Sequence, residues 1–370
     1  MILKLEYKDL TNTKTNLPNG AFAYKEEIND PFGKEINQVI VSNGALRFSV
    51  ILERGMNIGE LYLKEQKVSW DRERKFLLHP ANVDLAKNNG TGWMDGFFPA
   101  VASIGPELFG TPGEGLTLHG TSSYSPAVLD SVRITADDTY IVVEGLVPVK
   151  GYESKPAFEK KVKIITAYNS AAVLIEESTK NVSTSERVVD DGHHIQLYSS
   201  YLENGGRYVL PVATKHLLLR DSAPKENDPL NIPALEEGPQ PIRCYQYVPH
   251  AVDGLEDLEP IKQYYNLLLK EKGLTAEMIM DNGSNFAGYV IRPLECFPRS
   301  LIAKEIADTA MFALEPCRTR PNRMSQIITD GEAIYLKPQE ELVTQCLIGV
   351  SFEKEVIMSL AKAIEEKMYA

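Results

Sequence analysis

The histidines of this sequence are the first candidates for acid–base chemistry, because imidazole gains and loses a proton near neutral pH. The chain contains six: His79, His119, His193, His194, His216 and His250. His119 lies in the segment LTLHGTSSYSPA. If that segment is a strand, Thr117 and His119 share the face opposite the two leucines, and Gly120 allows a ligand to come close. This pattern makes His119 a candidate site residue, although a lone histidine is more often structural.

His193 and His194 are adjacent, in the segment DDGHHIQLYSSYLENGG. Neighbouring residues of a strand point to opposite faces, so only one of the two can enter a given site. His193 shares its face with Ile195 and Leu197, whereas His194 shares its face with polar residues that begin with Gln196. The pattern therefore favours His194, with Gln196 beside it, as a site residue and His193 as a packed one.

A carboxylate at the end of a strand suits a general base at the mouth of a cavity. Glu315 lies in ADTAMFALEPCRTRPNR, where Pro316 ends the strand ladder directly after it. From spacing alone, an ordinary surface glutamate is the more common explanation. Three arginines follow, Arg318, Arg320 and Arg323. They could bind an anionic group on a substrate, or they could simply offset the acidic surface.

Two further side chains could contact a substrate, Arg54 in LERGMNIGEL and Trp93 in NGTGWMDGFFPA. A tryptophan ring can stack on a sugar, but a buried packing role is more common. Asp190 and Asp191 precede the histidine pair without a third ligand at recognisable spacing, so we predict no metal site. The sequence also lacks a GxGxxG that opens a helix, GxxxxGK[ST], HExxH and GxSxG. Nucleotide-binding, zinc-peptidase and α/β-hydrolase functions therefore lose their usual support.

The elements that must position these residues are short β-like segments separated by turn residues. They cover 36–55, 130–151, 158–183, 207–221 and 334–352. In the third of these, two apolar runs flank Tyr168-Asn169-Ser170, which predicts a hairpin. Strands at close spacing without long helices between them predict a mainly β fold, a large antiparallel β-sandwich.

Residues 353–370 are the exception, because apolar side chains recur there at the spacing of an amphipathic helix. That pattern predicts a terminal helix packed on the sandwich. The segment 260–273 could form either a short helix or a strand and a turn. The stretches 80–115 and 222–242 are irregular in composition, and the second carries five prolines. We expect one domain over 1–370, with 222–242 as a surface loop.

The composition is that of an acidic globular protein. The 370 residues carry a formal net charge of −12 and no basic tract, which argues against nucleic acid as a partner. No apolar run approaches the roughly 18 residues of a membrane helix, and the start, MILKLEYKDL, does not resemble a secretory signal. The cysteines form no CxxC pair and indicate free thiols in a reducing compartment; they are Cys244, Cys296, Cys317 and Cys346. We expect a cytoplasmic protein without nucleic-acid or membrane partners.

Several segments, taken in order, resemble the aldose 1-epimerase (galactose mutarotase-like) superfamily, and more narrowly a bacterial branch of poorly defined function. These segments are LERGMNIGELYLKEQKVSW, GWMDGFFPAVASIGPE, LTLHGTSSYSPA, GHHIQLYSSYLENGGRYVLP, MFALEPCRTRPNR and LKPQEELVTQCLIGV. The resemblance covers roughly residues 35–352. It implies a large β-sandwich, the supersandwich of galactose mutarotases, whose concave sheet holds a sugar without a cofactor.

The resemblance also implies the chemistry. In these mutarotases a glutamate takes the proton of the anomeric hydroxyl while a histidine protonates the ring oxygen, so that the ring opens and recloses on the other face. By motif match, Glu315 takes the base position, His194 the acid position and His119 the position of a second histidine that polarises the substrate. Arg54, Trp93, Gln196 and Arg318 complete the expected substrate contacts. These implications predict an isomerase of carbohydrate metabolism.

The sequence departs from galactose mutarotases at two of these positions. His194 is followed by Ile195-Gln196-Leu197, and Glu315 is followed by Pro316. The identity of the sugar therefore does not transfer, and His193 remains an alternative to His194. Two other functions stay open: a carbohydrate-binding or sensing protein without turnover, and an epimerase for an anionic sugar, phosphorylated or acidic. The oligomeric state is open as well, with a homodimer as one option.

Overall fold

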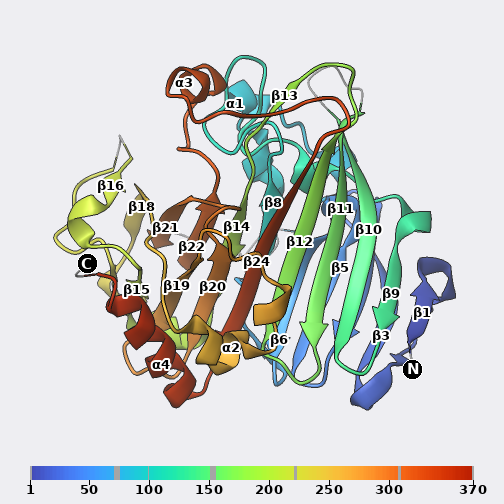
Figure 1. Ribbon diagram of the computed structural model, residues 1–370, viewed down its shortest axis with the longest axis horizontal. Helices are drawn as coiled ribbons and strands as arrows, with labels where there is room; N and C mark the ends of the chain where they lie inside the picture. Colours follow the sequence, from blue (N-terminus) through green and yellow to red (C-terminus); the bar gives the residue numbers. More distant parts are fainter. Residues whose placement is uncertain are drawn as a thin grey trace.

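The computed structural model describes residues 2–70, 76–98, 100–150, 156–220, 223–306 and 310–368. Two large antiparallel sheets dominate it, and Figure 1 shows one of them in front of the other. The front, 10-stranded sheet has the order β1 (Leu3–Glu6), β9 (Arg133–Ala136), β10 (Tyr140–Lys150), β11 (Pro156–Ala167), β12 (Ala172–Asn181), β24 (Glu341–Ser351), β20 (Ala287–Pro293), β19 (Leu274–Asp281), β15 (Gly206–Val209) and β17 (Asn231–Ile232).

The second sheet has 12 strands and carries the residues of interest. Its order is β16 (Leu218–Leu219), β18 (Gln240–Tyr247), β21 (Arg299–Ile306), β22 (Ala310–Cys317), β14 (Gly192–Gln196), β8 (Val101–Ile104), β6 (Asn57–Leu63), β5 (Leu46–Ile51), β4 (Glu35–Ser42), β3 (Phe22–Asn29) and β2 (Thr15–Asn16), with β7 (Gln66–Lys67) paired to β6. A separate pair joins β13 (Arg187–Val189) to β23 (Ile334–Leu336). The sandwich predicted from the strand pattern is confirmed.

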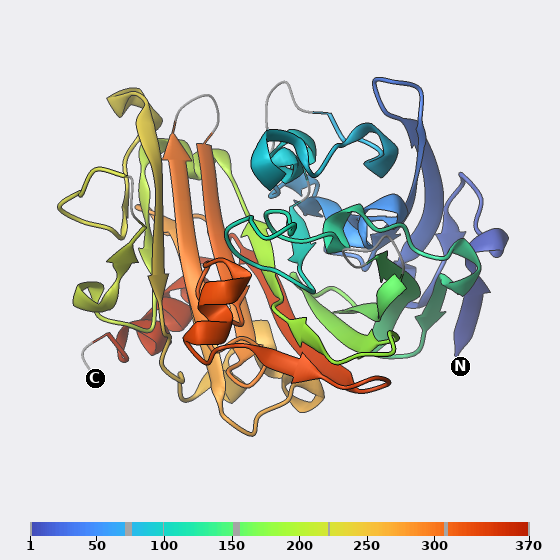
Figure 2. The same ribbon diagram turned by 90° about the horizontal axis from the view of Figure 1, so that it is seen from above.

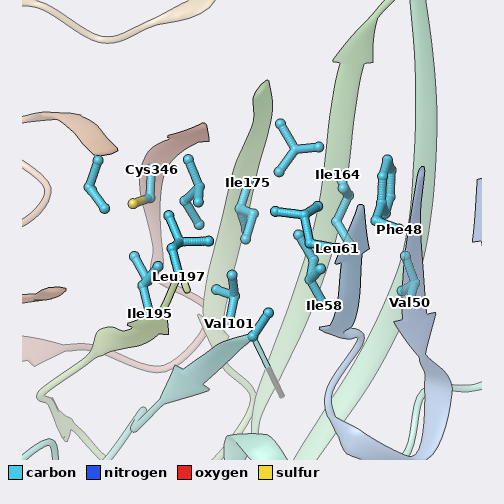
Figure 3. Close-up of a cluster of buried hydrophobic side chains, with 14 of the residues drawn as sticks. Phe48, Val50, Ile58, Leu61, Val101, Ile164, Ile175, Ile195, Leu197 and Cys346 are labelled. Atoms are coloured by element: carbon cyan, nitrogen blue, oxygen red, sulfur yellow. The ribbon is translucent and has the colours of Figure 1, made fainter. Parts of the chain in front are cut away.

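Alternation within the strands explains why the two sheets pack. Along β10, buried and half-buried residues alternate, so that one face of the strand enters the core. Side chains from both sheets meet between the layers, among them Ile164 and Ile175 from one sheet and Ile58 and Val101 from the other (Figure 3). The predicted hairpin over 158–183 is present as β11 and β12, paired antiparallel.

Helices are short except at the C-terminal end, where α4 (Lys354–Glu365) covers the outer face of the 10-stranded sheet. Its buried residues Ile357, Leu360, Ala361 and Ile364 are those of the predicted apolar stripe. The other α-helices are α1 (Lys87–Gly90), α2 (Glu259–Lys262) and α3 (Met324–Thr329). Helix α2 and a 3-10 turn at Tyr265–Leu267 occupy the undecided segment 260–273. None of the helices in the described part of the chain has the length and hydropathy that a membrane span requires.

The irregular stretch that includes residues 80–115 covers the opposite side of the molecule. In Figure 2 the cyan part of this stretch and the dark red helix α4 lie on opposite sides of the sandwich. Side chains from this stretch, such as Trp93 and Phe97, pack on Ala102, Ala303 and Ala313 of the 12-stranded sheet. Strand β14 is consequently buried along its whole length, with the core on one face and these loops on the other.

Two details of the expected strand pattern are wrong, and the expected loop contains short regular elements. Residues 116–119 form turns rather than a strand, and His119 has a left-handed backbone (φ 59°). The run 207–221 is divided between two sheets, because β15 ends at Val209 and β16 begins at Leu218. Within 223–242, the expected loop contains β17, a 3-10 turn at Leu235–Glu237 and the start of β18.

Truncation of a side chain between the sheets tests this packing. Ile164 is 0% exposed in the core cluster, so Ile164→Ala should lower the free energy of unfolding by about 2–5 kcal/mol, because it leaves a cavity. Val343→Ala is the matched control, since Val343 is 41% exposed and should change stability by no more than about 0.5 kcal/mol. Urea unfolding measures both. Equal effects of the two substitutions would contradict the core assignment.

Candidate active site

The register of two neighbouring strands brings a histidine and a glutamate face to face. Strands β14 and β22 pair antiparallel, with Gly192 opposite Cys317 and Ile195 opposite Leu314. His194 is therefore directly opposite Glu315, on the face away from the core. The His194 Nε2 atom lies 3.5 Å from the Glu315 Oε1 atom. Two residues far apart in the sequence thus form one acid–base pair.

The surroundings of His194 determine which nitrogen faces the glutamate. The Gln196 side-chain amide nitrogen donates a hydrogen bond to Nδ1, which leaves the proton on Nε2. The Phe97 ring meets the imidazole edge-on at 4.7 Å, and Trp93 lies 6.1 Å away in a stacked arrangement. Burial lowers the pKa of His194 well below its usual value, and the nearby His119 lowers it further. The free imidazole is therefore neutral near pH 7.

Glu315 is also shielded from solvent. It is 4% exposed, and this burial raises its pKa to about 7, while the positive charge of Arg220 acts in the opposite direction. Its other strand neighbour is Leu301 of β21, which offers no hydrogen bond to a carboxylate. A carboxyl group with a pKa near 7 can hold or release a proton at physiological pH, as an acid–base catalyst must.

His119 reaches the same place from a loop. Its ring centre lies 5.7 Å from that of His194 and 4.7 Å from Trp93. Its Nδ1 lies 2.7 Å from the Phe109 carbonyl oxygen, and because a carbonyl can only accept, Nδ1 carries the proton. Desolvation lowers the pKa of His119 to about 4, so the ring is neutral. The Nε2 atom is then a hydrogen-bond acceptor.

Asp190 links the loop that holds His119 to the strand that holds Glu315. Its carboxylate accepts hydrogen bonds from the backbone N–H of Phe109 at 2.8 Å and from the Thr319 hydroxyl at 2.7 Å. Burial raises the pKa of Asp190 to about 7. Asp190 and Asp191, weighed from the sequence as metal ligands, are thus engaged in hydrogen bonds and an ion pair. Across the described ranges, no cluster of three or more potential metal-ligating side chains occurs.

Two of the expected substrate contacts are engaged with other parts of the chain. Arg54 is 0% exposed and donates to the carbonyl oxygens of Ser123, Leu78 and Gly96, so its guanidinium ties loops together. Arg318 is buried as well, and its Nε donates to Asp191 at 2.5 Å. All three nitrogens of Arg54 are thus engaged, whereas the Nη2 atom of Arg318 is buried without a hydrogen-bond partner among the described residues.

Trp93 and Gln196 do lie at the site, but behind His194 rather than in front of it. Trp93 is 0% exposed and packs against both histidines, so it offers no open ring face for a sugar. Gln196 orients the imidazole.

The residue that sequence reasoning missed is Arg220. It follows β16 and is half-buried, and its charge acts on both Glu315 and His119. Nothing in the segment TKHLLLRD distinguishes this arginine from the other basic residues of the chain. Only the fold brings it beside the acid–base pair.

Comparisons with known proteins agree with this architecture. The chain is similar to a candidate aldose 1-epimerase from Klebsiella pneumoniae, with a TM-score of 0.76 at 15% identity over 99% of this chain and 91% of that one. It is similar to a galactose mutarotase-like protein from Clostridium acetobutylicum, with a TM-score of 0.59 at 14% identity over 89% and 99% of the two chains. It is also similar to a galactose 1-epimerase from Lactobacillus acidophilus, with a TM-score of 0.51 at 10% identity over 89% and 98%.

Likeness at these identities establishes the fold alone. No curated protein matches the chain in sequence. A family model described as a domain of unknown function, DUF4432, matches residues 33–242. The chain therefore belongs to the DUF4432 family and has the galactose mutarotase-like fold.

Proposed function

We propose that this protein is an aldose 1-epimerase-like isomerase that interconverts the anomers of a sugar. The observation that carries the proposal is the 3.5 Å approach of His194 to Glu315 on adjacent strands. In the proposed reaction, Glu315 accepts the proton of the anomeric hydroxyl and His194 gives a proton to the ring oxygen. The bond from C1 to the ring oxygen breaks and a carbonyl forms at C1. Rotation about C1 and the reverse proton transfers close the ring on the other face.

The charge state of the pair supports this use. Acid–base catalysis needs one group with a proton and one without. At a pH between the low pKa of His194 and the pKa of about 7 of Glu315, the pair holds one titratable proton, which is mainly on the carboxyl group. The reaction uses the other arrangement of this proton, in which Glu315 is a carboxylate and His194 is an imidazolium with both ring nitrogens protonated. In that state the Gln196 amide must turn so that its Oε1 atom, which has no hydrogen-bond donor among the described residues, accepts from Nδ1. His119, with Nε2 as an acceptor, can hold a sugar hydroxyl in place.

The pH dependence of kcat/KM follows from this single proton. Above about pH 7 the free enzyme loses the proton from Glu315 while His194 stays neutral, so no acid remains. We therefore expect kcat/KM to fall as pH rises through about 7, and to fall again in acid where His194 also becomes protonated. Anomer exchange measured by NMR across this pH range tests the profile. A rate that keeps rising above pH 8 would contradict it.

The second candidate function is sugar binding without turnover, and the covering of the site favours it. Glu315 is 4% and His194 6% exposed, so a sugar must displace covering side chains to reach them. NMR exchange spectroscopy on a panel of aldoses separates the two functions. Faster exchange than in buffer supports the isomerase, whereas saturable binding with an unchanged exchange rate supports the binding protein.

A further inference from the structure

A cavity of about 320 Å³ lies near the acid–base pair and is lined in part by β18 and β21 of the 12-stranded sheet. Leu301 lines the cavity and is the strand partner of Glu315, and Gln246 lines it and is the strand partner of Leu301. Because neighbouring strands lie about 4.8 Å apart, the cavity begins one strand away from the glutamate. A sugar with C1 at Glu315 would therefore direct a distant substituent into it.

The wall of this cavity contains cationic and titratable nitrogen groups and no carboxylate. Its lining residues are Val212, His216, Leu218, Gln246, Tyr247, Val248, His250, Arg299, Ser300, Leu301, Thr319, Arg320 and Pro321. Ion pairs with Glu332 fix the two arginines, with Arg299 at 2.9 Å and Arg320 at 2.6 Å. In a protein with a net charge of −12, a cavity without acidic lining residues repels an anion less than the rest of the surface does, while Glu332 already balances part of the charge of the two arginines.

Arg220 contacts a residue of the cavity wall, and its charge acts on Glu315. Its Nη2 donates to the Thr111 hydroxyl at 3.2 Å and to the carbonyl oxygen of Pro321, a cavity residue, at 3.4 Å. Within the described ranges, no carboxylate comes within 4.0 Å of its guanidinium, in contrast to Arg299 and Arg320. Removing a guanidinium from water is unfavourable unless an anion compensates for it. A half-buried arginine without a carboxylate partner among the described residues can therefore pair with an anion.

Gln246 supplies a second open contact in the same wall. Its Oε1 atom is buried, and the described residues provide no hydrogen-bond donor for it. A buried acceptor of this kind is normally paired, because its desolvation costs free energy. A hydroxyl group of a bound sugar would satisfy it.

We propose that the substrate is a sugar with an anionic substituent, a phosphate or a carboxylate, which pairs with Arg220 and lies in this cavity. The inference rests on the proposed function, since it places C1 of the sugar at Glu315 and His194. It also replaces the anion clamp expected from the sequence, because Arg318 is paired with Asp191, and Arg320 with Glu332.

The test compares matched sugars in wild type and in Arg220→Gln, whose amide can still donate to Thr111. The probes are glucose, glucose 6-phosphate and glucuronate, assayed for anomer exchange by NMR and for binding by thermal shift. In wild type, kcat/KM should be about ten- to a hundredfold higher for one of the anionic sugars, the usual worth of a charge-assisted hydrogen bond. In Arg220→Gln this preference should disappear through a higher KM, and Arg220→Lys should restore part of it.

Arg133→Gln is the matched control, because Arg133 lies on β9 of the other sheet with an exposed side chain. It should keep the wild-type preference. Equal kcat/KM for the three sugars in wild type, or an unchanged preference in Arg220→Gln, would overturn the inference and leave the proposed function standing. No exchange with any sugar would count against the proposed function instead. In that case, a larger thermal shift with an anionic sugar than with glucose, lost in Arg220→Gln, would still support the anion site, and equal shifts would refute it.

Discussion

Glu315→Gln is expected to lower the rate of anomer exchange by about 10²–10⁴-fold, the usual contribution of a general base. The amide has nearly the shape of the carboxyl group but cannot accept the proton of the anomeric hydroxyl. The loss should appear in kcat, because Glu315 accepts the proton of the anomeric hydroxyl only when the ring begins to open. NMR exchange spectroscopy on wild type and variant, at the pH of maximal wild-type activity, measures it.

Stability separates this loss from misfolding. Burial raises the pKa of Glu315 to about 7, so the folded state holds a proton that the unfolded state releases above its ordinary pKa, near 4.5. Wild-type stability therefore falls as pH rises from about 4.5 to 7, and the loss remains at higher pH. Glutamine has no proton to lose, so Glu315→Gln should be more resistant to urea than wild type at pH 8.

Glu53→Gln is the matched control, because Glu53 is another buried carboxyl group whose pKa burial raises. It contacts Asn37 at a distance from the acid–base pair and should leave the exchange rate unchanged. Equal losses of activity in both variants would show that any buried carboxyl group matters, and would remove Glu315 from the proposed mechanism.

Strand alternation predicted the faces of the two central residues from the sequence. His194 and Glu315 both alternate with core residues, and both do face away from the core. Alternation does not reveal which strands are neighbours, however, because pairing depends on contacts between segments far apart in the chain. Only the resemblance put Glu315 and His194 in one site, and the pairing of β14 with β22 was not predicted.

His119 was placed at the site for a reason that the structure contradicts. Its segment is not a strand, and His119 lies in a turn whose position depends on Asp190 and on the Phe109 carbonyl. Gly120, which follows, has a backbone φ of 63°, a left-handed conformation that favours glycine and is typical of turns. The signal was present in the pair His119-Gly120, but it indicated a turn.

The arginines show where sequence reasoning stops. An arginine can bind a ligand only if nearby carboxylates and carbonyls leave some of its N–H groups unused, and those partners come from distant loops. Gly96 and Ser123 occupy Arg54, and Asp191 occupies Arg318. Arg220, which has no recognisable motif around it, is left without a described carboxylate partner. Ion pairing across a fold is a property of its topology and not of local spacing.

A comparison of His194→Asn with His193→Asn decides which of the adjacent histidines acts in the reaction. His194→Asn should lower the exchange rate by about 10²–10⁴-fold, because asparagine cannot become a cationic proton donor to the ring oxygen. His193 points into the core, where its ring meets Phe297 at 5.5 Å and its Nε2 lies 3.8 Å from Glu177. Its replacement leaves a cavity, so His193→Asn should lower stability by about 0.5–3 kcal/mol.

The two variants therefore affect different measurements. At a temperature well below both unfolding midpoints, His193→Asn should retain most of the wild-type exchange rate per folded molecule, whereas His194→Asn should not. Urea unfolding of both variants provides the stability comparison. The opposite result, with activity lost only in His193→Asn, would place the proton donor between the sheets, beside Lys160 and Glu177. Because those residues form a buried ion pair at 2.8 Å, on the face of β14 opposite Glu315, that outcome would refute the proposed mechanism as a whole.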